Sequence, residues 1–74
     1  MIGPQMENIT LVINGESRSI PMVSNVLELI QHLGIFENRI AVELNKNIIR
    51  RGDWENTLVG NGDRVEIVQF VGGG

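Results

Sequence analysis

Apolar and polar positions alternate over residues 9–13 and 17–22, and this period of two predicts two strands. Asn14-Gly15 between them favours a tight hairpin, because both central residues of a type I′ turn need a positive φ. Pro21 predicts an edge position for the second strand, since proline has no N–H to donate to a neighbour. The chain therefore opens with a predicted β-hairpin.

The apolar pattern then changes to helical spacing, which predicts one amphipathic helix of two to three turns. Ser24 is the expected N-cap, and this choice puts Glu28 one residue too late for a capping box. Gly34 is the expected C′ residue in the left-handed conformation. The predicted buried stripe consists of Val26, Leu29, Ile30 and Leu33.

Alternation returns in the second half of the chain, where residues 40–44 predict a strand and 48–49 a very short one. Residues 65–71 predict the final strand, and polar clusters at 45–47 and 61–63 predict turns. A helix between two strand pairs in so short a chain must pack across one face of one sheet.

The expected fold is α+β, a β-grasp (ubiquitin-like) mixed sheet of four to five strands with one main helix. Its last strand lies parallel to the first and is reached by a crossover. Residues 6–71 are expected to form the domain. Residues 1–5 are predicted to be a disordered extension, and residues 72–74 a flexible tail.

Composition narrows the possible functions. The 74 residues include no cysteine and one histidine, His32, so disulfides, Cys-based zinc or iron–sulfur sites and multi-histidine sites are excluded, and no metal site is expected. A net charge of −3 and no basic run beyond Arg50-Arg51 argue against nucleic-acid binding. No apolar stretch approaches a membrane span, which is about 20 residues. A cytoplasmic domain, monomeric when free and without membrane partners, is expected.

No acid–base pair or activated nucleophile is evident, so intrinsic catalysis is not expected. The candidate functional residues are instead Gly72, Gly73 and Gly74, which can enter a narrow site because glycine has no Cβ. Three extended residues reach about 10 Å at roughly 3.3–3.6 Å each. The competing interpretation is a frayed terminus without function.

Strand alternation also predicts exposed apolar residues beside this tail. Val65 and Ile67 share one face of the final strand, and Val68 and Phe70 take the other. The helix can cover only one face, so Val68, Phe70 and the adjacent Val71 are expected to dock against a partner. The alternative is that a loop folds over them.

Residues 62–74, with their Gly-Asp turn, the strand V-E-I-V-Q-F-V and terminal glycines, closely resemble the end of the thiamine-biosynthesis sulfur carriers, the ThiS family. Residues 40–54 also resemble the central region of that family, V-x-x-N-x-x-I-V-x-R-x-x-W. Arg50 stands where many members carry proline, and Gly72 is an additional glycine that the family tolerates. The resemblance covers the chain from about Met6 onward.

The resemblance implies that the chain is a protein cosubstrate and not an enzyme. A ThiF-like adenylating enzyme that uses ATP and Mg is expected to activate the Gly74 carboxylate, so the chain itself binds no cofactor. A persulfide-bearing donor then leaves a thiocarboxylate on Gly74, and thiazole synthase receives its sulfur.

Four alternatives remain open. Two are other sulfur carriers: the small subunit of molybdopterin synthase, whose members tend to be longer, and a carrier for cysteine or methionine biosynthesis. The third is a non-covalent ubiquitin-like interaction module, which needs a surface patch but no free terminus. The fourth is a modifier conjugated to proteins through Gly74.

Overall fold

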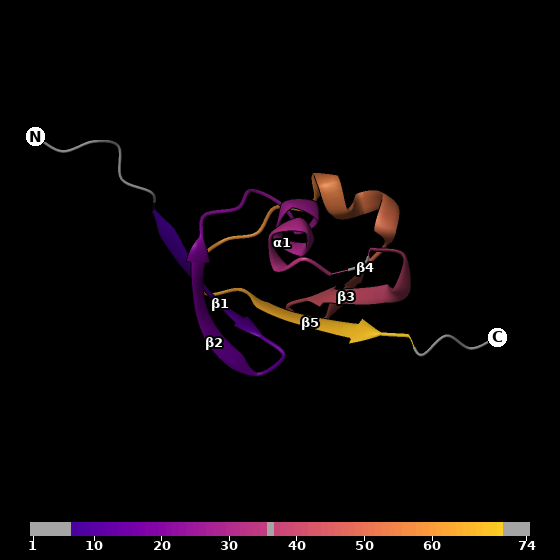
Figure 1. Cartoon of the computed structure of the whole chain (residues 1–74), viewed down its shortest axis with the longest axis horizontal. Helices are drawn as coiled ribbons and strands as arrows, with labels where there is room; N and C mark the ends of the chain where they lie inside the picture. Colours follow the sequence, from indigo (N-terminus) through magenta and orange to yellow (C-terminus); the bar gives the residue numbers. More distant parts are fainter. Residues whose placement is uncertain (1–6, 36, 71–74) are drawn as a thin grey trace, which may run out of the picture.

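A five-stranded mixed sheet lies beneath a short helix in the computed structural model, which describes residues 7–35 and 37–70 (Figure 1). The strand order is β2-β1-β5-β3-β4, so the last strand occupies the centre. In chain order the elements are β1 Asn8–Ile13, β2 Glu16–Pro21, α1 Val26–Leu33, η1 Glu37–Arg39, β3 Ile40–Leu44, β4 Asn47–Ile49, η2 Arg51–Asn56 and β5 Arg64–Gln69.

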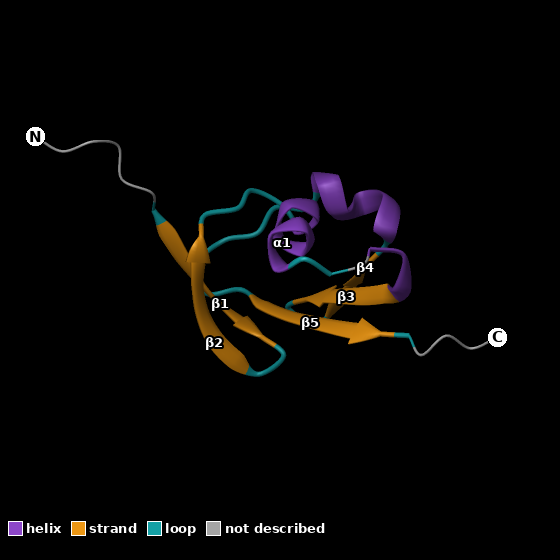
Figure 2. Ribbon diagram, viewed as in Figure 1, coloured by secondary structure: helices purple, strands orange, loops and turns teal. Residues whose placement is uncertain are grey.

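The central strand β5 pairs in parallel with β1 and antiparallel with β3. The parallel pairing is short and joins Val12 to Arg64 and Ile13 to Val65. Both hairpins, β1–β2 and β3–β4, are antiparallel. Figure 2 shows α1 and the 3-10 segment η2 on the same side of this sheet. The topology confirms the predicted β-grasp fold, and β2 is an edge strand as Pro21 indicated.

The core lies between α1 and the inner face of the sheet. Inward positions of the strands alternate with more exposed ones, most clearly in β3. From the helix, the predicted residues Val26, Leu29 and Ile30 are fully buried, whereas Leu33 at the last turn is only partly buried. The largest fully buried side chains are Trp54, Leu11, Leu29, Ile30, Val26, Val42 and Val65.

Asn25, and not Ser24, is the N-cap of α1. Its backbone is extended (φ −145°, ψ 174°), and its Oδ1 accepts the Glu28 N–H at 2.8 Å. Glu28 in turn accepts the Ser24 N–H at 2.8 Å through Oε1. With the cap one residue later than expected, Glu28 sits at the third helical position and completes a reciprocal arrangement of the capping-box type. Gly34 ends the helix with φ 72°, as predicted.

The observed strand ends differ by one or two residues from the predicted ones. β2 covers Glu16–Pro21, where residues 17–22 were expected, and Met22 follows it as an exposed side chain. β5 covers Arg64–Gln69, where residues 65–71 were expected. It begins earlier because the Arg64 backbone already pairs with Val12 of β1. The last residue of the expected strand, Val71, lies outside the described residues.

Candidate functional site

The exposed face of β5 carries the two described residues that were predicted to dock. Val65 and Ile67 are buried beneath α1, whereas Val68 is 54% exposed and Phe70, just beyond the strand, is 58% exposed. No described loop covers them, so the predicted exposure is observed, and the docking role remains a prediction. The third docking residue, Val71, and the tail residues Gly72, Gly73 and Gly74 lie outside the described residues.

The neighbours of Val68 define the rest of this open face. Val68 is paired with Ala41 of β3, and the adjacent row pairs Glu66 with Glu43. Ile48 of β4, opposite Glu43, is 73% exposed on the same face. The open face therefore has an apolar end near the exit of β5 and an acidic row behind it. A partner with apolar side chains at this exit would bury Val68 and Phe70 without desolvating either carboxylate.

The start of β5 is fixed by side chains of the turns around it. Asp63 Oδ2 accepts the Gly60 N–H at 2.8 Å, and its Oδ1 accepts from Asn45 Nδ2 at 3.1 Å. Asn45 Oδ1 accepts the Arg64 N–H at 2.9 Å, and Asn61 Oδ1 accepts the Thr10 N–H at 2.7 Å. These bonds hold the Gly-Asp turn against both hairpins, so the strand leaves it in one direction.

Further along β5, a second turn asparagine replaces a missing strand neighbour. The β1–β5 pairing stops at Val65, and the side chain of Asn14 then accepts the Ile67 N–H at 2.7 Å. The same amide donates through Nδ2 to the Ile67 carbonyl at 3.3 Å. Asn14 therefore extends the parallel ladder by one residue toward the exit of β5. The sequence predicts Asn14 only as a turn residue and does not reveal this positioning role.

The two turn asparagines share one conformational signal. Asn14 (φ 50°) and Asn45 (φ 51°) each start a two-residue turn with positive φ, followed by Gly15 and Lys46 respectively. Asparagine tolerates this region better than most residues, and its short amide can hydrogen-bond to nearby backbone. The turn chemistry was readable from the sequence. The long-range partner was not, because it depends on where β5 lies.

The other two candidate side chains, His32 and Trp54, lie outside this open face. His32 is exposed in the last turn of α1. Trp54 is 1% exposed, donates from Nε1 to the Ile49 carbonyl at 3.0 Å, and has the Arg51 guanidinium 4.8 Å from its ring centre. It therefore closes the core. Residues 7–35 and 37–70 contain no group of three or more potential metal ligands and no helix long and apolar enough to cross a membrane.

The domain defined by this fold, with a central last strand whose outer face is open, has the β-grasp architecture. Residues 11–74 match the ThiS family, and the chain belongs to that family. Its similarity to solved structures agrees. The thiamine biosynthesis protein ThiS from Geobacter metallireducens, a crystal structure, superposes with a TM-score of 0.77 at 33% identity. The match covers 89% of this chain and all of that one.

Similar sequences fall into two groups. Thiazole synthase from Paramagnetospirillum magneticum is 41% identical over 64 residues, which are 86% of this chain and 20% of that protein. The thiazole synthase of Magnetococcus marinus is 32% identical over 62 residues, 84% of this chain and 19% of that protein. The chain thus spans about a fifth of these two relatives. The uncharacterized protein ycf40 of Porphyra purpurea is 32% identical over 68 residues, 92% of this chain and 96% of that protein.

Proposed function

We propose that this domain is a sulfur carrier for thiazole formation in thiamine biosynthesis and acts as a protein cosubstrate. Membership of the ThiS family carries the proposal. Two further observations support it: the similarity to a solved thiamine biosynthesis protein, and relatives called thiazole synthase that contain a similar region. The geometry is compatible, because β5 is held by the turns around its start and by Asn14, and Phe70 at its end belongs to an exposed apolar face.

The chemistry would take place at the Gly74 α-carboxylate, which is ionised at neutral pH and is a poor electrophile. A carboxylate oxygen attacks the α-phosphorus of ATP in a ThiF-like enzyme, and pyrophosphate leaves. The terminal sulfur of a protein persulfide then attacks the acyl carbon and displaces AMP. A second thiol cleaves the resulting acyl disulfide and releases the Gly74 thiocarboxylate. Thiazole synthase receives this sulfur.

The residues of this chain would contribute binding and presentation in each step. ATP and Mg would be held by the adenylating enzyme, since the sequence around Gly60 and Gly62 lacks the lysine and spacing of a phosphate-binding loop. Sulfur would have to come from another protein, because the chain has no cysteine. Val68 and Phe70 would face the adenylating enzyme, with Val71 and the glycines entering its active site. The chain and these partner proteins would meet in the cytoplasm.

Intact-mass spectrometry tests this proposal. The chain is incubated with a ThiF-like enzyme, Mg-ATP, a persulfide donor and a thiol that cleaves the acyl disulfide, and exchange of one oxygen for sulfur is expected. Tandem spectra should place the exchange on Gly74. A variant lacking Gly74 is the matched control and should remain unmodified while its circular dichroism is unchanged. Absence of the exchange in the complete mixture, with a known ThiS protein modified in parallel, would overturn the proposal.

A further inference from the structure

The β1-facing side of β5 is open beyond Ile67. Phe70 N–H donates to the Arg39 carbonyl at 2.8 Å, on the β3 side of the strand. Because successive residues of a strand point their backbone groups in opposite directions, the N–H and C=O of Gln69 face the other side. There the Asn14 amide is the last partner, at Ile67, and the described residues supply no ladder partner for Gln69. Among residues 7–35 and 37–70, the edge is therefore open for one more pairing at Gln69.

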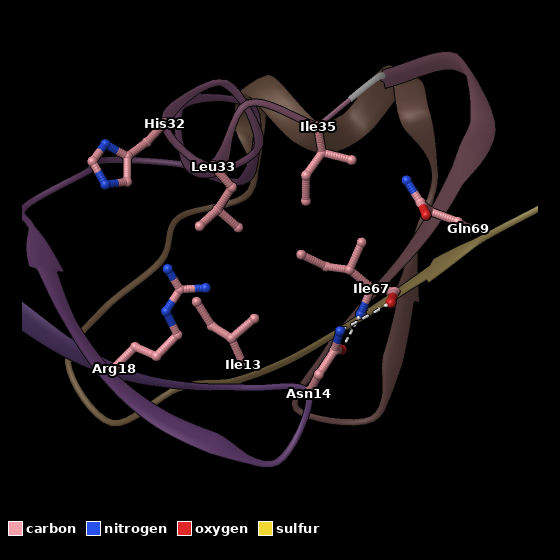
Figure 3. Close-up of a pocket in the computed structure, with 8 residues that line it drawn as sticks. All are labelled: Ile13, Asn14, Arg18, His32, Leu33, Ile35, Ile67 and Gln69. Atoms are coloured by element: carbon pink, nitrogen blue, oxygen red, sulfur yellow. Dashed lines mark hydrogen bonds between the residues drawn. The ribbon is translucent and has the colours of Figure 1, made fainter.

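A recess of about 450 Å³ lies directly beside this open edge (Figure 3). Ile13 and Ile67 rise from the sheet, and Leu33 and Ile35 face them from the end of α1. Gln69 lines the recess from β5, so the open backbone edge and the recess are parts of one surface. An added strand would lie along the edge and direct alternate side chains into the recess.

The wall of the recess carries basic side chains within an acidic chain. Arg18 of β2 and His32 of α1 line its wall on the side away from Gln69, and Figure 3 shows both side chains there. None of the lining residues is acidic, although the whole chain carries a net charge of −3. A fixed cation in this wall favours an incoming segment that carries a carboxylate.

We propose that an extended segment of thiazole synthase pairs with β5 at Gln69 as an additional strand. It would place a carboxylate next to Arg18 and His32. Strand addition to an open edge takes affinity from the backbone bonds and specificity from the alternate side chains. The inference rests on the proposed function for the choice of partner, which the similar regions within thiazole synthases favour.

This surface is separate from the open face. Val68 and Phe70 point away from α1, whereas the recess is on the α1 side of the same strand. A partner paired at Gln69 would therefore leave Val68 and Phe70 accessible. The carrier would present one surface to the adenylating enzyme and another to thiazole synthase.

Amide hydrogen exchange tests the backbone pairing. The ¹⁵N-labelled full chain is mixed with saturating unlabelled thiazole synthase, and exchange at Gln69 is expected to slow at least about tenfold. Ser19 is the matched control, because the register of the β1–β2 hairpin turns its N–H outward on the opposite edge of the sheet. Its exchange should stay unchanged. Unchanged exchange at Gln69 in the saturated complex would overturn the proposal.

Charge reversal tests the recess. Arg18→Glu should weaken binding of thiazole synthase about tenfold or more, whereas Arg50→Glu, an exposed charge outside the recess, should alter it less than about twofold. Arg18→Gln is a milder variant in case the reversal disturbs folding. Equal affinity of the wild type and both Arg18 variants would overturn the inference.

The proposed function is measured separately, by thiocarboxylate formation on the wild-type chain. Failure of that reaction would overturn the carrier function. Success of the reaction, combined with unaffected binding of the Arg18 variants, would overturn only the proposal that thiazole synthase binds at the recess. The two proposals can therefore fail independently.

Discussion

Asn14 and Ile67 lie 53 residues apart in the sequence and are joined by two hydrogen bonds between one side-chain amide and one backbone unit. The amide takes the place that the next residue of β1 would occupy if that strand did not turn. It therefore continues the parallel ladder where β1 has ended. The direction of the last strand depends on a turn residue of the first hairpin.

Replacement of Asn14 by glycine should therefore loosen β5 without disturbing the turn. Glycine keeps the positive φ but removes both bonds to Ile67, for an expected loss of about 1–2 kcal/mol in the free energy of unfolding. Urea denaturation gives this value, and amide exchange at Ile67 should accelerate. Lys46→Gly is the control: it also occupies a turn position with positive φ, 73°, and should be neutral or stabilising. A similar loss in both variants would contradict the role assigned to the Asn14 side chain.

The cap of α1 makes a second prediction, because two adjacent polar residues compete for the role. Asn25→Ala removes the bond from Oδ1 to the Glu28 N–H and should cost about 1 kcal/mol. Ser24→Ala should cost little, since Ser24 contributes its backbone N–H to Glu28 and not its hydroxyl. Thermal and urea unfolding of the two variants measure the difference. A larger loss for Ser24→Ala would restore Ser24 as the cap.

The order and type of the main elements were predictable because the hydrophobic periods are clear. Alternation over residues 9–13 and 40–44 and the stripe of Val26, Leu29 and Ile30 determine which faces are buried. The cap and the strand ends were less accurate, since Ser24 and Asn25 are both good caps and only the register decides. The Asn14–Ile67 bonds were out of reach, because no local pattern reveals which strand lies beside a turn.

Trp54 of η2 is the largest fully buried side chain among the described residues. It is 1% exposed and satisfies its indole N–H on the Ile49 carbonyl. Trp54→Ala should therefore destabilise the domain by about 3–5 kcal/mol through the cavity and the lost bond. Arg51→Ala removes the cation above the ring, a contact worth about 0.5–1 kcal/mol. Denaturant titrations followed by circular dichroism test both values, and a small loss in Trp54→Ala would contradict its place in the core.

Phe70→Asp tests the open face as the surface for the adenylating enzyme. Phe70 is 58% exposed and lies beyond the last residue of β5, so the substitution should leave the stability of the domain nearly unchanged. A carboxylate there would have to be desolvated in an apolar contact, which should lower the efficiency of adenylation, kcat/KM for the carrier, at least about tenfold.

Leu58→Asp is the matched control for this surface. Leu58 is 75% exposed and lies in the segment between η2 and β5, outside the open face. ATP–pyrophosphate exchange with the ThiF-like enzyme measures both variants after their circular dichroism spectra have been matched to the wild type. The prediction is a selective loss in Phe70→Asp. Equal rates in Phe70→Asp, Leu58→Asp and the wild type would show that the enzyme binds the carrier at a surface other than the open face.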